Sequence, residues 1–206
     1  MNGIATLWDV ERLDDEAETV ELPASTYELI REGAGIDPSA PALSFFLEAD
    51  AHRDVETWTY AELLAAITRT ANFFHRLGAT KDTVIAFVLP NLPETHFVIW
   101  GGEAAGIVLA LNPLLEGPAL AKLLDAARAE ILVTLAPFPG TDVWSKIEPV
   151  LPSVRSLRHL VLVDLADHVR GPRSIAARAI RFAESARRHG IRGLRGAVPG
   201  WMRVHD

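Results

Sequence analysis

Between residues 83 and 165 the chain alternates apolar runs of strand length with longer amphipathic segments. The apolar runs are 83–90, 107–112, 130–135 and 157–165. Continuous apolarity is typical of strands that are covered on both faces, as in parallel sheets. The segments between them, ~10–15 residues long, repeat their apolar positions at helical spacing. The pattern predicts an α/β fold with a mostly parallel, doubly wound sheet and helices on both faces.

A helix is predicted immediately before the first of these runs. Thr59 and Glu62 have capping-box spacing, in which each side chain bonds the backbone N–H of the other residue. Gly78 is placed to end the helix. The apolar positions between these signals recur at helical spacing, and they are Tyr60, Leu63, Leu64, Ile67, Ala71 and Phe74.

A β-hairpin and a short helix are predicted further towards the N-terminus. ALSFFLEA (42–49) and VETWTY (55–60) flank a polar tip and form the expected hairpin. The short helix is expected over residues 25–32, ended by Gly33 and Gly35.

Three helices are expected between the strands. Residues 91–94, Asn-Leu-Pro-Glu, have capping-box spacing for the first helix, which Gly106 ends. The second begins at Pro118, and the third covers 141–151. The chain then divides into an acidic arm (1–24), an α/β unit (25–167) and a basic helical or irregular tail (168–206).

Composition and charge limit the classes of function. The chain has 206 residues, 49% of them hydrophobic, and no cysteine, which excludes a disulfide framework and a thiolate metal site. Residues 1–62 hold 15 acidic against 3 basic side chains, whereas residues 170–206 hold 9 arginines against 2 acids. The overall charge of −7 argues against nucleic acid as a partner. No signal-peptide pattern begins the chain, so a cytoplasmic location is expected.

GGEAAGIVLALNPLL (101–115) is the stretch that most resembles a functional site. A phosphate-binding loop is not expected, because its glycines lie within or late in a helix and precede a strand. A membrane span is not expected either, because Glu103 lies near the centre of the apolar stretch. The sequence predicts that the glycines allow close helix packing and that Glu103 lies at the helix surface or is paired.

The chain offers no catalytic, cofactor-binding or metal-binding residue by motif. The seven histidines have no metal-ligand spacing, and G-x-S-x-G is absent. Paired carboxylates occur only in the acidic arm. A basic helix expected at 171–190 could contact anionic lipid, but its apolar face is mostly alanine, so membrane contact is not expected.

Three passages together carry a family resemblance. They are TWTYAELLAAITRTANFFHRLGATKDTVIAFVLPNLPE (57–94), GGEAAGIVLALNPLLEGPALAKLLDAARAEILVT (101–134) and LRHLVLVDL (157–165). From about Pro41 to Leu165 the chain resembles the N-terminal part of the adenylate-forming enzymes, closest to the acyl-CoA synthetases (fatty-acid–CoA ligases). The resemblance implies a ligase in which ATP, magnesium and a fatty or other carboxylic acid give an acyl-adenylate, which coenzyme A converts to a thioester.

The family's functional residues have no counterparts in this sequence. A Ser-, Thr- and Gly-rich nucleotide loop ending in Pro-Lys-Gly does not occur in residues 1–206, nor does the C-terminal catalytic lysine. The loop APFPGTD (136–142) lacks the arginines that meet coenzyme A in the acetyl-CoA branch. ATP, magnesium and coenzyme A are therefore expected for the complete enzyme only, and the fold is expected to be incomplete relative to the family's full N-terminal domain.

The sequence thus predicts a truncated, substrate-site-supporting subdomain that is inactive alone. An alternative is a non-catalytic interaction module that forms a homo-oligomer or complements a separate, missing C-terminal half. A third is a small α/β binding domain with a ligand at the carboxyl ends of its strands.

Overall fold

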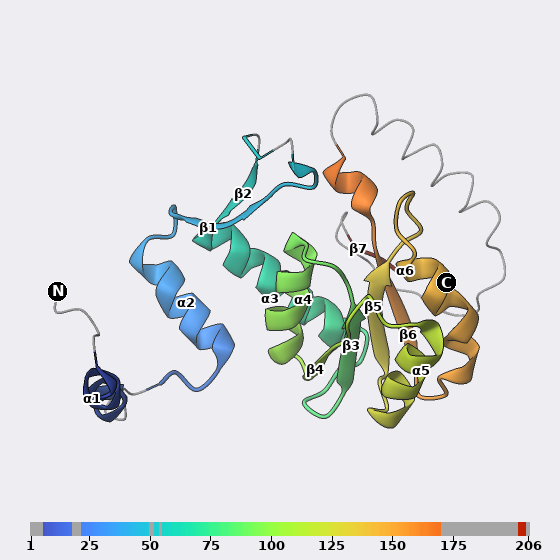
Figure 1. Ribbon diagram of the computed structural model, residues 1–206, viewed down its shortest axis with the longest axis horizontal. Coiled ribbons are helices and arrows are strands. Elements are labelled where there is room, and N and C mark those ends of the chain that lie inside the picture. Colours follow the sequence, from blue (N-terminus) through green and yellow to red (C-terminus); the bar gives the residue numbers. More distant parts are fainter. Residues whose placement is uncertain (1–5, 18–21, 50–51, 54, 170–201, 205–206) are drawn as a thin grey trace.

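A sheet with four parallel strands forms the centre of the molecule (Figure 1). The computed structural model describes residues 6–17, 22–49, 52–53, 55–169 and 202–204. The strands lie in the order β4-β3-β5-β6-β7, and β7 is antiparallel to β6. Their bounds are β3 Val84–Val88, β4 Ile107–Ala110, β5 Ile131–Leu135, β6 His159–Val163 and β7 Met202–Val204. The first four strands confirm the parallel sheet predicted from the apolar runs.

Helices cover both faces of this sheet, which confirms the predicted doubly wound arrangement (Figure 1). α3 (Tyr60–Arg76) and α4 (Pro93–Glu103) pack together on one face. α5 (Gly117–Ala126) and α6 (Val143–Ile147) lie on the other. β4 and β5 border β3 on opposite sides, so the β3–β4 and β4–β5 crossovers run in opposite directions. Because such crossovers are right-handed, their helices α4 and α5 lie on opposite faces of the sheet.

The predicted capping box begins α3. The Thr59 hydroxyl accepts the Glu62 backbone N–H at 3.3 Å, and the Glu62 carboxylate accepts the Thr59 N–H at 2.8 Å. Gly78 follows the helix with a φ of 91°, a left-handed conformation that favours glycine. The start and end of this helix are both confirmed.

The N-terminal elements differ in part from expectation. The hairpin is confirmed, with β1 (Pro41–Phe45) antiparallel to β2 (Glu56–Thr59). The short helix does not end at Gly33 and Gly35, because α2 runs from Thr26 to Ile36. Packing explains its length, since Ala34 is buried and Tyr27 and Ile30 contact the apolar cluster beneath the hairpin.

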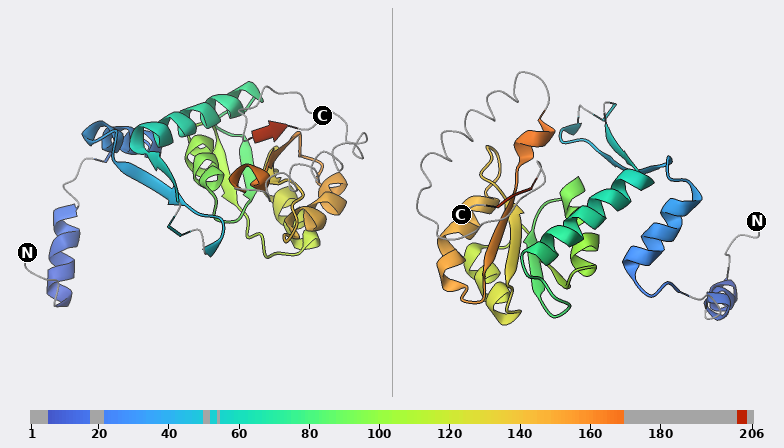
Figure 2. Two further views of the ribbon diagram at one scale, coloured as in Figure 1. Left: turned by 90° about the horizontal axis from the view of Figure 1, so that it is seen from above. Right: turned by 180° about the vertical axis from the view of Figure 1, so that it is seen from behind.

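The acidic arm contains a helix, α1 (Leu7–Ala17). It lies apart from the other elements in every view (Figures 1 and 2). Its apolar side chains Leu7, Trp8 and Val10 are exposed.

The glycine-rich stretch is scaffold, as predicted. A Cβ added to Gly101 would lie 2.7 Å from Thr70 Cβ and 2.8 Å from the Ile67 carbonyl oxygen, both on α3. Gly102 faces Val108 of β4 in the same way. Close packing of α4 therefore requires both glycines. Glu103 is exposed, as expected, and α4 ends at this residue, earlier than the predicted end at Gly106.

The prediction of a single helix over 141–151 is wrong. α6 covers only Val143–Ile147 and continues as a 3₁₀ helix, η2 (Glu148–Ser153). Pro149 and Pro152 explain the change, because proline lacks the N–H needed for an α-helical hydrogen bond.

The basic helix expected at 171–190 lies outside the described residues. None of the helices in the described ranges has the length and apolarity needed to cross a membrane.

Candidate site at the carboxyl edge of the sheet

Three segments meet above the carboxyl ends of the parallel strands, which we call the carboxyl edge. In doubly wound sheets, ligands bind at this edge, where neighbouring crossovers diverge. Here they diverge between β3 and β5, because the connection after β3 runs to β4 and the connection after β5 runs the other way to β6. The segment after β3 leads into α4. The segment after β6 forms a 3₁₀ turn, η3 (Leu165–His168). The hairpin lies beside η3 (Figure 1).

A buried histidine joins the three segments. His168 Nε2 lies 2.9 Å from Glu94 Oε1, and its Nδ1 lies 3.1 Å from Glu56 Oε2. The side chains of His168 and Glu94 are only 6% and 4% exposed, whereas that of Glu56 is 24% exposed. We call these residues the Glu56–His168–Glu94 cluster.

The start of α4 places Glu94. The Thr95 hydroxyl accepts the Leu92 N–H at 3.3 Å and donates to the Pro90 carbonyl at 2.6 Å. The cap is therefore Leu92 with Thr95, and the capping role expected for Asn91 and Glu94 is wrong. Glu94 instead points into the molecule towards His168.

The end of β6 places His168. The Asp164 carboxylate accepts the Ala166 N–H at 2.9 Å and so begins η3. Leu165 and Ala166 are buried, which fixes the turn against the core. His168 follows directly after the expected boundary of the α/β unit at residue 167, which stays a prediction.

The hairpin supplies the third side of the cluster. Glu56 pairs with Phe45 in the β1–β2 ladder, so both residues lie at the loop end of the hairpin. The Phe45 ring meets the His168 ring edge-on, with 5.1 Å between the ring centroids. One histidine therefore contacts a residue pair on two adjacent strands.

The geometry fits a protonated His168. A carboxylate is an acceptor only, so each ring nitrogen must donate if both hydrogen bonds are to form. Burial by itself would lower the pKa of His168, but the hydrogen bond and charge of Glu94, followed by those of Glu56, raise the pKa to about 9. The cluster is a carboxylate–imidazolium–carboxylate bridge.

The cluster does not have the form of a metal or nucleotide site. Its carboxylates contact opposite nitrogens of the ring, and the described residues contain no group of three or more His, Asp or Glu side chains placed to hold a metal ion. Phosphate binding favours cationic side chains or clustered free N–H groups, whereas here the cation is already bonded by two carboxylates.

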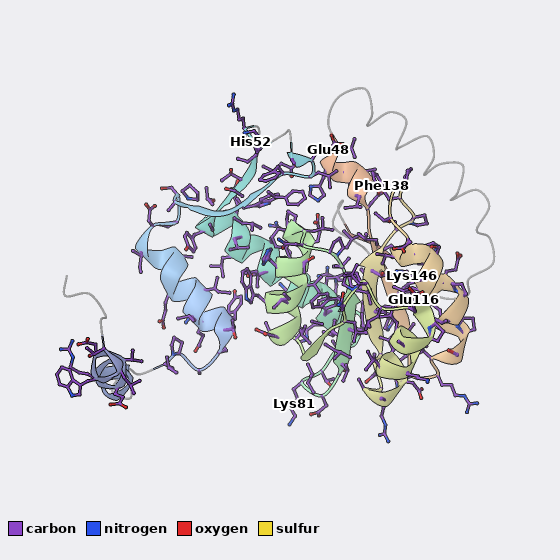
Figure 3. All side chains as sticks on the ribbon, in the orientation of Figure 1. Glu48, His52, Lys81, Glu116, Phe138 and Lys146 are labelled. Carbon is purple, nitrogen blue, oxygen red and sulfur yellow. The ribbon has the colours of Figure 1, made fainter. Side chains whose placement is uncertain are left out.

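Lys146 is a second described cation that is paired. Lys146 follows the loop after β5 that carries Phe138, and its Nζ lies 2.9 Å from Asp142 Oδ2 and 3.8 Å from Glu116 Oε1 (Figure 3). The hydrogen bond with Asp142 raises the pKa of Lys146. The paired cations at this edge do not fit the phosphates of ATP, and the described residues include no group of carboxylates and histidines that fits magnesium.

Sequence reasoning did not find the cluster. The histidines were expected to be scattered, and paired carboxylates were expected only in the acidic arm. Glu94 and His168 are 74 residues apart, and Glu56 and His168 are 112 apart, so no local spacing links them. The predicted topology could have brought two of the residues together. Glu94 and His168 each follow a predicted parallel strand, and the carboxyl ends of such strands share one edge of the sheet.

The sequence profile described as AMP-binding enzyme matches residues 30–187 of the chain. The chain is 35% identical over 107 residues to marinolic acid–CoA ligase of Pseudoalteromonas sp. strain SANK 73390, which covers 52% of the chain and 16% of the ligase. It is 38% identical over 86 residues to crotonobetaine/carnitine–CoA ligase of Salmonella arizonae, which covers 41% of the chain and 17% of that ligase. The chain thus spans about a sixth of the length of these relatives.

Solved ligase structures share the fold. The anthranilate CoA ligase AuaEII, in complex with anthranoyl-AMP, matches with a TM-score of 0.58 and 16% identity, over 78% of this chain and 28% of that protein. A putative long-chain-fatty-acid CoA ligase from Rhodopseudomonas palustris matches with a TM-score of 0.56 and 21% identity, over 72% and 37%. The described α/β unit therefore has the fold of part of these ligases.

Proposed function

Because this chain belongs to the AMP-binding enzyme family, we propose that it is the N-terminal, substrate-site-supporting part of an ATP-dependent acyl-CoA ligase. In the complete enzyme, a carboxylic acid and ATP give an acyl-adenylate, and coenzyme A then takes the acyl group. The observation that carries the proposal is the family match over residues 30–187. The ligase activities in the names of the relatives support the reaction class.

In this proposal the chain contributes scaffold rather than chemistry. Its sheet and the helices on both faces form one layer, and the carboxyl edge supports the site where the acid is activated. The described residues at that edge offer paired charges and no cluster of cations for phosphates. We therefore expect residues 1–206 alone not to form acyl-adenylates.

Exchange of labelled pyrophosphate into ATP tests the inactivity of the isolated chain. The purified chain is assayed with crotonobetaine, carnitine, anthranilate and a long-chain fatty acid, the acids that occur in the names of its relatives. We expect no exchange above the acid-free blank, while the complete Salmonella ligase, assayed in parallel, exchanges with its own substrate. Acid-dependent exchange by the purified chain would contradict the proposed inactivity.

A chimera tests the supporting role directly. Residues 30–169 of this chain replace the matching segment of the Salmonella ligase, and the control is the ligase's own segment reinserted through the same junctions. We expect the chimera to retain acid-dependent exchange at a reduced rate. A folded chimera that shows no exchange, beside an active control, would argue against the supporting role.

The alternative of a non-catalytic interaction module is not favoured. Neither the described residues nor the similarities to known proteins support a homo-oligomer or a separately encoded second half. A cytoplasmic location stays a prediction from the sequence.

A further inference from the structure

The loop end and the base of the hairpin are held in different ways. At the base, Trp58 of β2 meets Phe97 of α4 at 6.1 Å between ring centroids and packs on a buried apolar cluster that includes Leu63 and Ile67. At the loop end, Phe45 and Leu47 pack against the main apolar core, and Phe45 and Glu56 also contact His168. Apolar packing does not depend on pH, whereas an imidazolium contact does.

Among the described residues, few charged groups face His168. α4 contributes Glu94 and β2 contributes Glu56, whereas the contact from β1 is the uncharged Phe45. Within η3, the Asp164 carboxylate bonds the Ala166 N–H, and Asp167 is exposed. The protonated cluster has a net charge of −1, and loss of the His168 proton would leave two carboxylates facing one neutral ring.

A neutral imidazole cannot hold both carboxylates. It has one N–H donor, so one ring nitrogen would present a lone pair to a carboxylate. Glu94 is almost fully buried at the start of α4, while Glu56 is a quarter exposed on the hairpin. The Glu56 contact is therefore the one that breaks, because Glu56 can turn to water at small cost.

We propose that the Glu56–His168–Glu94 cluster is a proton-dependent fastening that holds the loop end of the hairpin against the carboxyl edge of the sheet. While His168 is protonated, the hairpin is joined to η3 and α4. When His168 loses its proton, the Glu56 contact breaks and the loop end loosens against η3, while the apolar contacts of Phe45, Leu47 and Trp58 remain. The position of the loop end of the hairpin relative to η3 then depends on pH.

The pH range follows from the direction of the shift. The pKa of His168 is raised from 6.5 to about 9 in the folded chain. The stabilisation is complete below the unfolded value and is lost as the pH rises through the folded value. The fastening is therefore expected to weaken progressively from pH 6.5 to pH 9 and to be open above that range.

Hydrogen exchange of the intact chain at pH 7 and pH 10, corrected for intrinsic rates, tests the proposal. Amides of β1, β2 and η3 are expected to lose protection on the order of tenfold or more at the higher pH, since the shifted pKa lies between the two. Amides of β3 and β5 are expected to keep theirs. Equal losses in all strands, or no loss in the hairpin, would overturn the proposal.

Two substitutions separate the fastening from general alkaline unfolding. Glu56→Gln removes one of the charges that favour the imidazolium, so the loss of hairpin protection should move to lower pH. The matched control is Glu103→Gln, an exposed position on α4, which should leave the transition where it is in the wild type. A transition that moves equally in both variants, or in neither, would contradict the assignment to this cluster.

NMR of the wild-type imidazole gives a test that needs no variant. Long-range ¹H–¹⁵N spectra should show both His168 nitrogens protonated at pH 7, and this signal should titrate together with the hairpin protection. A His168 that is neutral at pH 7 would overturn the proposal, even if every variant failed to fold.

Discussion

Glu94 illustrates how one residue can satisfy a local pattern and still serve another purpose. Its position after Leu92 and Pro93 has the spacing of a helix cap, but Thr95 caps the helix and Glu94 bonds His168. A carboxylate in the first turn interacts favourably with the helix dipole whether it caps the helix or bonds a distant residue. The choice between them depends on a partner 74 residues away, which no local pattern contains.

Gly101 shows the opposite case, in which the local pattern was sufficient to predict the role. Replacing Gly101 with Ala is expected to lower the free energy of unfolding by about 1–3 kcal/mol, the usual range for overpacking a core. The added Cβ would lie 2.7 Å from Thr70 Cβ. Urea unfolding followed by circular dichroism measures the change.

The control substitution is Gly35→Ala in α2, where an added Cβ meets nothing within 4 Å. Alanine in a helix is favoured over glycine by about 0.5–1 kcal/mol, so this variant should be as stable as the wild type or slightly more so. If both alanines had the same effect, close packing at Gly101 would not be its cause.

At the scale of elements, the sequence predicted the helices and strands whose caps, apolar pattern and terminal residues lie within the element itself. α3 carries its own cap, apolar face and terminal glycine, and both of its ends were predicted. α2 runs past Gly33 and Gly35 because the packing of Ile30 and Ala34 outweighs the low helix propensity of glycine. α6 ends early because of prolines that the apolar pattern did not take into account.

Thr59 is expected to stabilise α3 through its hydroxyl. Thr59→Ala should lower the free energy of unfolding by about 1 kcal/mol, because the Glu62 N–H loses its acceptor. Thr59→Ser keeps the hydroxyl and should remain near the wild type. Thermal unfolding of the three proteins compares them, and a serine variant as unstable as the alanine variant would exclude the cap as the cause.

At the scale of the whole molecule, the α/β class and the family were predictable and the position of the hairpin was not. The apolar runs predicted the α/β class, and three passages in the order 57–94, 101–134 and 157–165 carried the ligase resemblance. Nothing in the hairpin sequence indicates that it reaches η3, because the contact is made by polar side chains from separate elements. The candidate site was therefore missed, although the hairpin, the helix that carries Glu94 and the strand before η3 were predicted.

The exposure of α1 leads to an expectation for the molecule as a whole. Removing residues 1–21 should change the free energy of unfolding by no more than about 0.5 kcal/mol, because Leu7, Trp8 and Val10 are all exposed. Chemical denaturation of the shortened chain measures this.

Removing α2 as well should destabilise the chain markedly. That deletion takes away the 2.8 Å hydrogen bond between the Tyr27 and Thr68 hydroxyls and the packing of Ile30. A large loss of stability on removing residues 1–21 alone would mean that α1 supports the fold after all.

The contact between Glu56 and His168 also bears on the order in which the chain folds as it is made. These residues are 112 positions apart, and long-range contacts form late because the intervening chain must first be ordered. On the ribosome, the hairpin, α3 and β3 emerge well before the residue that supplies the positive charge between Glu56 and Glu94. We therefore expect a nascent intermediate in which these two carboxylates keep their water, and desolvation of Glu94 becomes one of the last events in folding.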